Sequence, residues 1–165
     1  MRVKILDERF RRDPKHYVLQ TGLAFAVVAA IIAVFGTLTH GAVVAALGAS
    51  AFIAFAMPKH DTAQPRRLLG GHAVCMAVGL LCSIPFRTGV LAESTVAVGA
   101  IAAAAVAISM FIMVITNTEH PPAAGNALAF AIGVVTLDHI LFTAGAVVFL
   151  SVAHRLLRSW LRDLA

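Results

Sequence analysis

The sequence has few charged residues, and this scarcity excludes an ordinary soluble domain. Asp, Glu, Lys and Arg make up 13% of the 165 residues, whereas 60% are hydrophobic. The mean hydropathy of +0.90 is typical of a chain whose apolar runs lie in a lipid bilayer. We therefore expect an all-α protein that crosses the membrane several times, and the length leaves no room for a second domain.

Sequence signatures of catalysis, metal binding and nucleic-acid binding are also lacking. Cys75 and Cys82 lie inside an apolar run, and we interpret them as small packing residues. No His pair in the long apolar segments has the spacing of a helical metal site, and no nucleotide-binding loop or nucleophile motif occurs. We expect no metal, no cofactor and no enzymatic activity. The formal net charge of +5 comes from residues that flank apolar runs, so we expect no nucleic-acid partner.

Six apolar segments are separated by short polar breaks. They cover about 18–36, 42–57, 68–86, 94–115, the run from Pro121-Pro122 to about 136, and 140–157. The second and fifth segments are shorter than the ~20 residues that a straight transmembrane helix needs. Each either crosses fully or begins inside the membrane as a half-helix, and the sequence leaves both options open.

The distribution of basic residues favours six crossings. With six, every Lys and Arg except Arg87 lies on one side, which the positive-inside rule assigns to the cytoplasm. Residues 1–17 then form a basic cytoplasmic arm, 18–157 the transmembrane domain and 158–165 a short cytoplasmic tail. We expect a multi-pass protein of a bacterial inner membrane. The segments also divide as three plus three, with His40 at the place of His120, which suggests an inverted repeat with a substrate site between its halves.

The organising feature is the polar stretch 117–126, which reads Asn-Thr-Glu-His-Pro-Pro-Ala-Ala-Gly-Asn. Proline lacks a backbone N–H and is tolerated at the first position of a helix, so we expect a helix to start at Pro121 or Pro122. The backbone N–H groups of Ala123, Ala124 and Gly125 would then be unpaired donors at the positive end of the helix dipole, where anions bind. His120 would supply a proton or hydrogen bond. The alternative is a cytoplasmic turn with solvated Glu119 and His120.

Two other stretches accompany it. Gly48, Ala49 and Ser50 are small residues that either allow close helix packing or let a substrate approach the backbone. Gly70-Gly71 weakens the start of its helix, which predicts close approach of another segment and makes His72 a candidate site residue. The expected substrate-binding residues are His120, Pro121, Pro122, Ala123, Ala124, Gly125, Asn126, Gly48, Ala49, Ser50 and His72. Glu119, Arg66 and Arg67 are the expected gating or entry residues.

Three stretches in this order resemble the HPP family of integral membrane proteins. They are Leu47–Ala51, Gln64–His72 and the signature His120-Pro121-Pro122. The resemblance covers about 20–157 and implies a small polytopic membrane protein. Members in chloroplasts and cyanobacteria are associated with nitrite transport. Family descriptions often count four spans rather than six, and the run Ala123–Asn126 departs from the usual continuation of the signature.

Together these features predict a small anion transporter or channel, with nitrite or a related monovalent oxyanion as the substrate. The expected partners are the lipid bilayer and that anion, and whether the chain forms a homo-oligomer stays open. The competing hypothesis is a membrane scaffold or sensor subunit that transports nothing. That protein would have a tightly packed interface without a polar cavity near His120.

Overall fold

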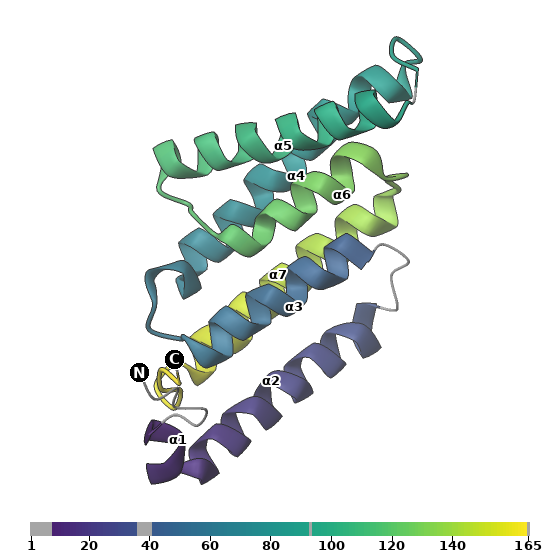
Figure 1. Cartoon of the computed structure of the whole chain (residues 1–165). Helices are drawn as coiled ribbons and strands as arrows, with labels where there is room; N and C mark the ends of the chain where they lie inside the picture. The colour runs from purple at the N-terminus through teal and green to yellow at the C-terminus, as the bar shows by residue number, and fades with distance from the viewer. Residues whose placement is uncertain (1–7, 36–40, 93, 165) are drawn as a thin grey trace.

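A computed structural model describes residues 8–35, 41–92 and 94–164, and every regular element in this part of the chain is helical. The helices from α2 to α7 lie side by side and alternate in direction (Figure 1). They are α2 (Pro14–Phe35), α3 (Gly41–Ala56), α4 (Pro65–Arg87), α5 (Thr95–Thr116), α6 (Ala124–Ile132) and α7 (Leu137–Leu157). A short helix, α1 (Glu8–Arg12), precedes them, and two 3-10 turns connect them: η1 (Asp61–Ala63) and η2 (Pro121–Ala123).

Four of the helices are long and apolar enough to cross a membrane: α2, α4, α5 and α7. The other two are shorter. α3 has 16 residues, and α6 has 9 residues preceded by the three-residue turn η2. Both short helices run alongside the long ones in Figure 1. The prediction of an all-α membrane protein with two short segments is confirmed.

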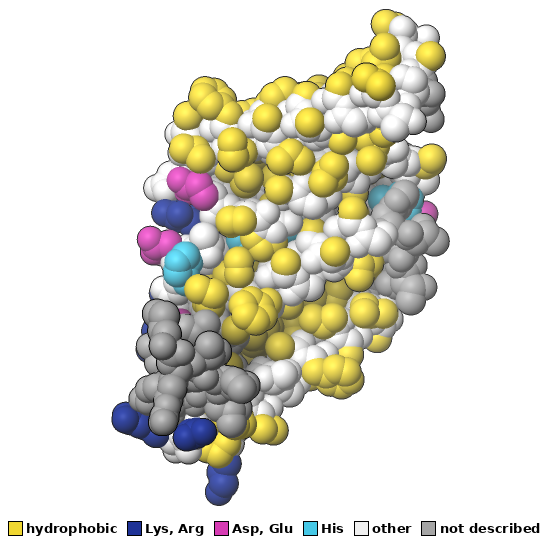
Figure 2. All heavy atoms as spheres, viewed as in Figure 1, with side chains coloured by type: hydrophobic (Ala, Val, Ile, Leu, Met, Phe, Trp, Pro, Cys, Tyr) yellow, Lys and Arg dark blue, Asp and Glu magenta, His cyan; other side chains and the backbone are white. Residues whose placement is uncertain are grey.

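One end of the bundle carries most of the charge. α2, α4 and α6 begin at this end, and α3, α5 and α7 end there (Figure 1). Lys and Arg side chains gather at the part of this end where α1 and α2 begin (Figure 2). Among the described residues, the basic side chain at the opposite end is that of Arg87. We call the charged end the basic end.

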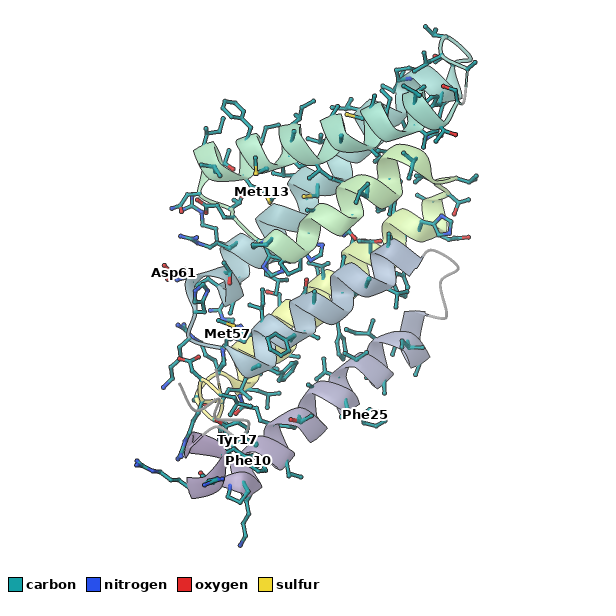
Figure 3. All side chains as sticks on the ribbon, in the orientation of Figure 1. Phe10, Tyr17, Phe25, Met57, Asp61 and Met113 are labelled. Carbon is teal, nitrogen blue, oxygen red and sulfur yellow. The ribbon has the colours of Figure 1, made fainter. Side chains whose placement is uncertain are left out.

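The first long helix begins earlier than the sequence predicts. α2 starts at Pro14 rather than near residue 18, because Asp13 caps it: Asp13 Oδ1 accepts a hydrogen bond from the backbone N–H of His16 at 3.3 Å. The rings of Phe10 and Tyr17 pack edge to face, 5.4 Å apart, and join α1 to this first turn (Figure 3). The rest of the predicted arm, residues 1–7, and His40 lie outside the described residues.

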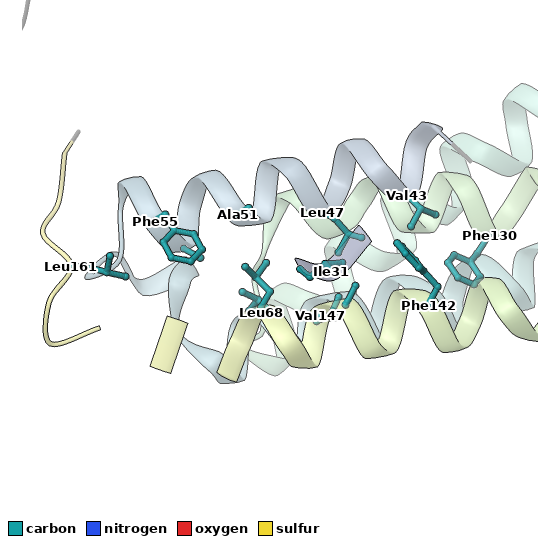
Figure 4. Packing of buried hydrophobic residues seen from close by; sticks show 13 residues of the cluster. Ile31, Val43, Leu47, Ala51, Phe55, Leu68, Phe130, Phe142, Val147 and Leu161 are labelled. Carbon is teal, nitrogen blue, oxygen red and sulfur yellow. The ribbon is translucent and has the colours of Figure 1, made fainter. Parts of the chain in front are cut away.

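Apolar packing between α3 and α7 forms the larger core. Figure 4 shows Val43 and Leu47 of α3 facing Phe142 and Val147 of α7, with Phe55 at the other end of α3 toward Leu161. A second cluster of smaller residues joins α4, α5 and α6. Cys75 belongs to it and lies 3.9 Å, sulfur to sulfur, from Met113, which is consistent with a packing role.

The helix contacts form a regular pattern. α2 packs against α3 and α7, whereas α5 packs against α6 and α4. In the centre, α3 contacts α6 and α7, and α4 contacts α6 and α7. The four central helices therefore enclose the middle of the bundle, with α2 and α5 at its two flanks.

Candidate functional site

Four polar side chains meet where the central helices converge. Ser50 comes from α3, His72 from α4, His120 from the link that precedes η2, and Asn126 from α6. Ser50, His120 and Asn126 are 0% exposed and His72 is 1% exposed. All four were predicted as site residues from the sequence, and the fold brings them together across 76 positions of the chain (126 − 50). We call these four residues the polar cluster.

Hydrogen bonds link the members of the polar cluster in series. Asn126 Nδ2 lies 2.7 Å from His72 Nδ1, and His72 Nε2 lies 2.9 Å from Ser50 Oγ. Ser50 Oγ lies 2.9 Å from His120 Nε2 as well, and His120 Nδ1 lies 2.8 Å from the carbonyl oxygen of Thr62. The two imidazole rings are 5.2 Å apart, centroid to centroid.

The Thr62 carbonyl determines which group donates and which accepts in each hydrogen bond of the series. A carbonyl only accepts, so His120 Nδ1 carries a proton and donates it to Thr62. His120 lies in the link outside the four long helices, and burial lowers its pKa, although the bond to Thr62 opposes this effect. In a neutral His120 ring, Nε2 must accept, so the Ser50 hydroxyl donates to it. His72 Nε2–H then donates to Ser50, and Asn126 Nδ2 donates to His72 Nδ1.

The same geometry suits a protonated His120. Ser50 Oγ also lies 2.9 Å from the carbonyl oxygen of Ala46, one turn earlier in α3. When His120 Nε2 carries a proton and donates to Ser50, the hydroxyl turns and donates to Ala46 instead. His72 and Asn126 keep their bonds in both states. The polar cluster therefore accommodates one added proton through rotation of a single hydroxyl.

Glycine lets the backbone carry His120 into this position. A Cβ atom on Gly71 would lie 2.7 Å from His120 Cβ and 2.9 Å from the Thr118 carbonyl oxygen, closer than real Cβ contacts allow. A Cβ atom on Gly125 would lie 3.0 Å from Ala46 Cβ, so α6 also packs tightly on α3. The prediction that Gly70-Gly71 marks the close approach of another segment is confirmed, but that segment is the link before η2 rather than the second or fifth apolar segment.

The charged residues lie above the polar cluster at the surface of the basic end. Arg67 Nη1 forms an ion pair with Glu119 Oε2 at 3.1 Å, and Arg67 Nη2 donates to Asn117 Oδ1 at 3.1 Å. Arg66 Nη2 donates to the Thr116 carbonyl at 3.1 Å. Arg66 and Arg67 thus tie the start of α4 to the end of α5, next to the link that carries His120.

Other predicted site residues lie away from the polar cluster or use their backbone differently. Gly48 and Ala49 are exposed, and a Cβ atom on Gly48 would meet nothing within 4 Å, so this face of α3 points away from the bundle. The double proline forms a 3-10 turn, in which the N–H of Ala123 donates to the His120 carbonyl at 2.9 Å and that of Ala124 to Pro121. The expectation that Ala123 and Ala124 offer free donors is therefore wrong, because the turn satisfies them.

The polar cluster lies below the surface of the basic end but not at the middle of the bundle. His72 follows the first residue of α4, Pro65, by seven positions in a helix of 23 residues. Seven residues of α-helix advance about 10 Å. The cluster is thus roughly a third of the way along α4. Three hollows among the described residues, of about 460, 340 and 280 Å³, are lined by other residues, and the four side chains of the cluster are at most 1% exposed.

Sequence reasoning missed two partners of the polar cluster. The Thr62 and Ala46 carbonyl groups hold His120 and Ser50, and a backbone acceptor leaves no mark in the residue type. Asn126 was easier to find, because an amide side chain inside an apolar segment needs a partner. In the described part of the chain, no three His, Cys, Asp or Glu side chains gather as a metal site would require. The side chains of the polar cluster offer hydrogen bonding and proton binding.

Sequence relatives agree with this architecture. Residues 10–162 match the family described as HPP, transmembrane region. A transmembrane protein of Dictyostelium discoideum is 34% identical over 91 residues, which make up 55% of this chain and 30% of that protein. The chain thus spans less than a third of the length of this relative. No solved structure matches the chain. Since the family match covers the polar cluster and all six helices, the protein belongs to the HPP transmembrane family.

Proposed function

We propose that the protein is a proton-coupled transporter of a small monovalent oxyanion, with nitrite as the first substrate to test. The observation that carries the proposal is the hydrogen-bonded series Asn126–His72–Ser50–His120, buried in a membrane protein. Ionisable and polar groups at such places commonly belong to substrate pathways and proton relays. The association of some family members with nitrite supports the choice of substrate. No chemical conversion is assigned to the site.

Electrostatics explain why a proton would accompany the anion. An anion alone in a low-dielectric interior is costly, whereas an anion beside a protonated imidazole forms a neutral pair. Burial lowers the pKa of His120 and so favours its neutral form in the empty site. A bound anion within about 4–6 Å would raise the affinity of His120 for a proton, and by linkage the proton would raise the affinity for the anion. The hydroxyl of Ser50 can follow this change by turning from His120 to Ala46.

The architecture fits such a transporter in two further ways. Exchange of α2–α4 with α5–α7 preserves the contacts among these six helices: α2 on α3 becomes α5 on α6, α3 on α7 becomes α6 on α4, and α2 on α7 becomes α5 on α4. The contacts of α3 with α6 and of α4 with α7 map onto themselves. This supports a three-plus-three inverted repeat, the arrangement in which several transporters hold their substrate between the halves. The excess of Lys and Arg at the basic end supports a cytoplasmic location of that end and of both termini.

The test is nitrite uptake by the purified protein in proteoliposomes under an imposed pH gradient. We expect uptake to increase with external acidity and to carry protons inward, as a dye inside the vesicles would report. His120→Asn keeps a donor for the Thr62 carbonyl but removes Nε2, and we expect it to lower uptake by about tenfold or more. Ser83→Ala is the matched control, because the Ser83 hydroxyl donates only to the Leu80 carbonyl. Uptake equal to that of empty vesicles under every gradient would exclude nitrite transport.

A specific observation also favours the second candidate function, a scaffold or sensor subunit that transports nothing. The four side chains of the polar cluster are at most 1% exposed, and three hollows among the described residues are lined by other residues, which agrees with that hypothesis. In that case His120→Asn would change stability and leave ion flux at the level of empty vesicles. A stable partner protein retained by the wild type and lost from the variant would then identify the function.

A further inference from the structure

A surface hollow lies at the basic end, away from the polar cluster. It has a volume of about 460 Å³, is open to one side, and lies between the first turns of α2 and the segment that follows α7. One wall is a single face of α2, because its residues recur three and four positions apart. The lining residues are His16, Leu19, Gln20 and Leu23 of α2, and Ser159, Trp160, Leu161 and Arg162 of the segment after α7. We call it the α2 groove.

Hydrogen bonds fix the outer wall of the α2 groove. Gln20 Nε2 donates to the Arg162 carbonyl at 2.7 Å, and the Arg162 N–H donates to Gln20 Oε1 at 3.1 Å. The same amide donates to the Phe55 carbonyl at the end of α3. Tyr17 donates its hydroxyl to the Leu164 carbonyl at 2.9 Å. The segment after α7 is therefore held against α2 without being helical, and specific hydrogen bonds define the shape of the groove.

The mouth of the α2 groove is polar and cationic. His16 Nε2 is buried and has no hydrogen-bond partner among the described residues. Arg162 Nη1 lies 3.4 Å from Asp13 Oδ2. A guanidinium has five N–H donors, so this one contact does not use all of them. Further basic residues stand on the neighbouring turns, and Lys and Arg side chains gather at this end of the molecule in Figure 2. They are Arg11, Arg12, Lys15, Arg155 and Arg158.

The inner part of the α2 groove is apolar. Leu19 and Leu23 continue down α2 from His16, and Leu161 closes the opposite wall. Trp160 is 72% exposed beside the mouth, as is common for indole rings at the boundary between water and lipid. The order along the groove, from cationic mouth to apolar floor, matches the order of a phosphate head group and its acyl chain.

We propose that the α2 groove binds an anionic phospholipid of the leaflet at the basic end. The phosphate would lie against Arg162 and His16, and one acyl chain would follow Leu19 and Leu23 into the bilayer. Basic pockets between transmembrane helices hold anionic head groups in this way. A bound lipid would accept hydrogen bonds from Arg162 and cover the apolar floor of the groove. The inference holds whether or not the protein transports an anion.

The experiment measures lipid binding by the purified full-length chain in detergent, with native mass spectrometry and thermal unfolding. The probes are phosphatidylglycerol, phosphatidylcholine with the same acyl chains, and inorganic phosphate. We expect retention of phosphatidylglycerol and a higher melting temperature with it, and neither effect with the other two. Phosphatidylcholine binding as tightly would overturn the proposal, and an equal effect of phosphate would replace the lipid with a free anion.

Variants locate the site. Arg162→Gln keeps the backbone contacts with Gln20 and should weaken phosphatidylglycerol binding by about fivefold, a modest loss because the side chain is largely exposed. His16→Gln should weaken it as well. Arg87→Gln removes the same charge at the opposite end and should change nothing. If Arg162→Gln and Arg87→Gln bound the lipid equally well, the α2 groove would not be the site.

Discussion

Ser50 Oγ lies 2.9 Å from Nε2 of His120, although 70 positions separate the two residues. The hydroxyl is the middle member of the polar cluster, since His72 Nε2 lies at the same distance on its other side. The two imidazole rings lie side by side, with centroids 5.2 Å apart and planes tilted by 48°, and both direct Nε2 toward the same hydroxyl. A single small side chain on α3 therefore joins α4 to the link before η2.

Replacing that hydroxyl should destabilise the fold more than an ordinary serine substitution. In Ser50→Ala, Nε2 of His72 and of His120 both lose their partner in a site that water does not reach, which costs about 1–3 kcal/mol for each buried group left unpaired. We expect a lower melting temperature in detergent. Ser83→Ala should have a small effect, since that hydroxyl has one local acceptor in its own helix. Equal melting temperatures for the two variants would contradict the role of Ser50.

Alanine substitution at two helical glycines, Gly71 and Gly48, should change the stability of the protein in opposite directions. Gly71→Ala places a Cβ atom 2.7 Å from His120 Cβ and 2.9 Å from a backbone oxygen, so the link must move at a cost of about 1–3 kcal/mol. Gly48→Ala meets nothing within 4 Å and should stabilise α3 by about 0.5–1 kcal/mol. Melting temperatures of the two variants in one detergent measure both effects. A stabilising Gly71→Ala would show that His120 does not pack here.

The sequence was informative where one residue type has one physical meaning. Long apolar runs marked the helices, Pro121 marked the start of η2, and Gly70-Gly71 marked a close approach. Boundaries that depend on local capping were less accurate, as Asp13 shows at the start of α2. The contacts of His120 with Thr62 and of Gln20 with Arg162 could not be foreseen, because they use backbone groups of distant segments.

The side chain of Gln20 attaches the segment after α7 to the bundle. Its amide pairs with both backbone groups of Arg162 and with the Phe55 carbonyl, and it is 2% exposed. Gln20→Leu keeps most of the volume but removes these bonds, so we expect local release of residues 158–164. Trypsin should then cleave after Arg158 and Arg162 faster than in the wild type, as mass spectrometry of the fragments would show. Thr21→Ala, which loses only a bond to the Tyr17 carbonyl, should keep the wild-type rate.

The stability of the protein should fall in mild acid in part through His120. Burial lowers the pKa of His120 in the folded protein, so between that value and the ordinary value of about 6.5 the unfolded chain binds a proton that the folded chain does not. Stability is then fully present above about pH 6.5 and decreases as the pH falls below it. His120→Asn removes this contribution while keeping a donor for the Thr62 carbonyl. Melting temperatures at pH 7.5 and 5.0 should therefore differ less in His120→Asn than in the wild type, and an unchanged difference would show that His120 is not the group that titrates. Nitrite at saturating concentration should reduce this difference in melting temperature between pH 7.5 and 5.0. The reduction should occur in the wild type alone if the anion pairs with protonated His120, because the folded protein would then bind the proton as well.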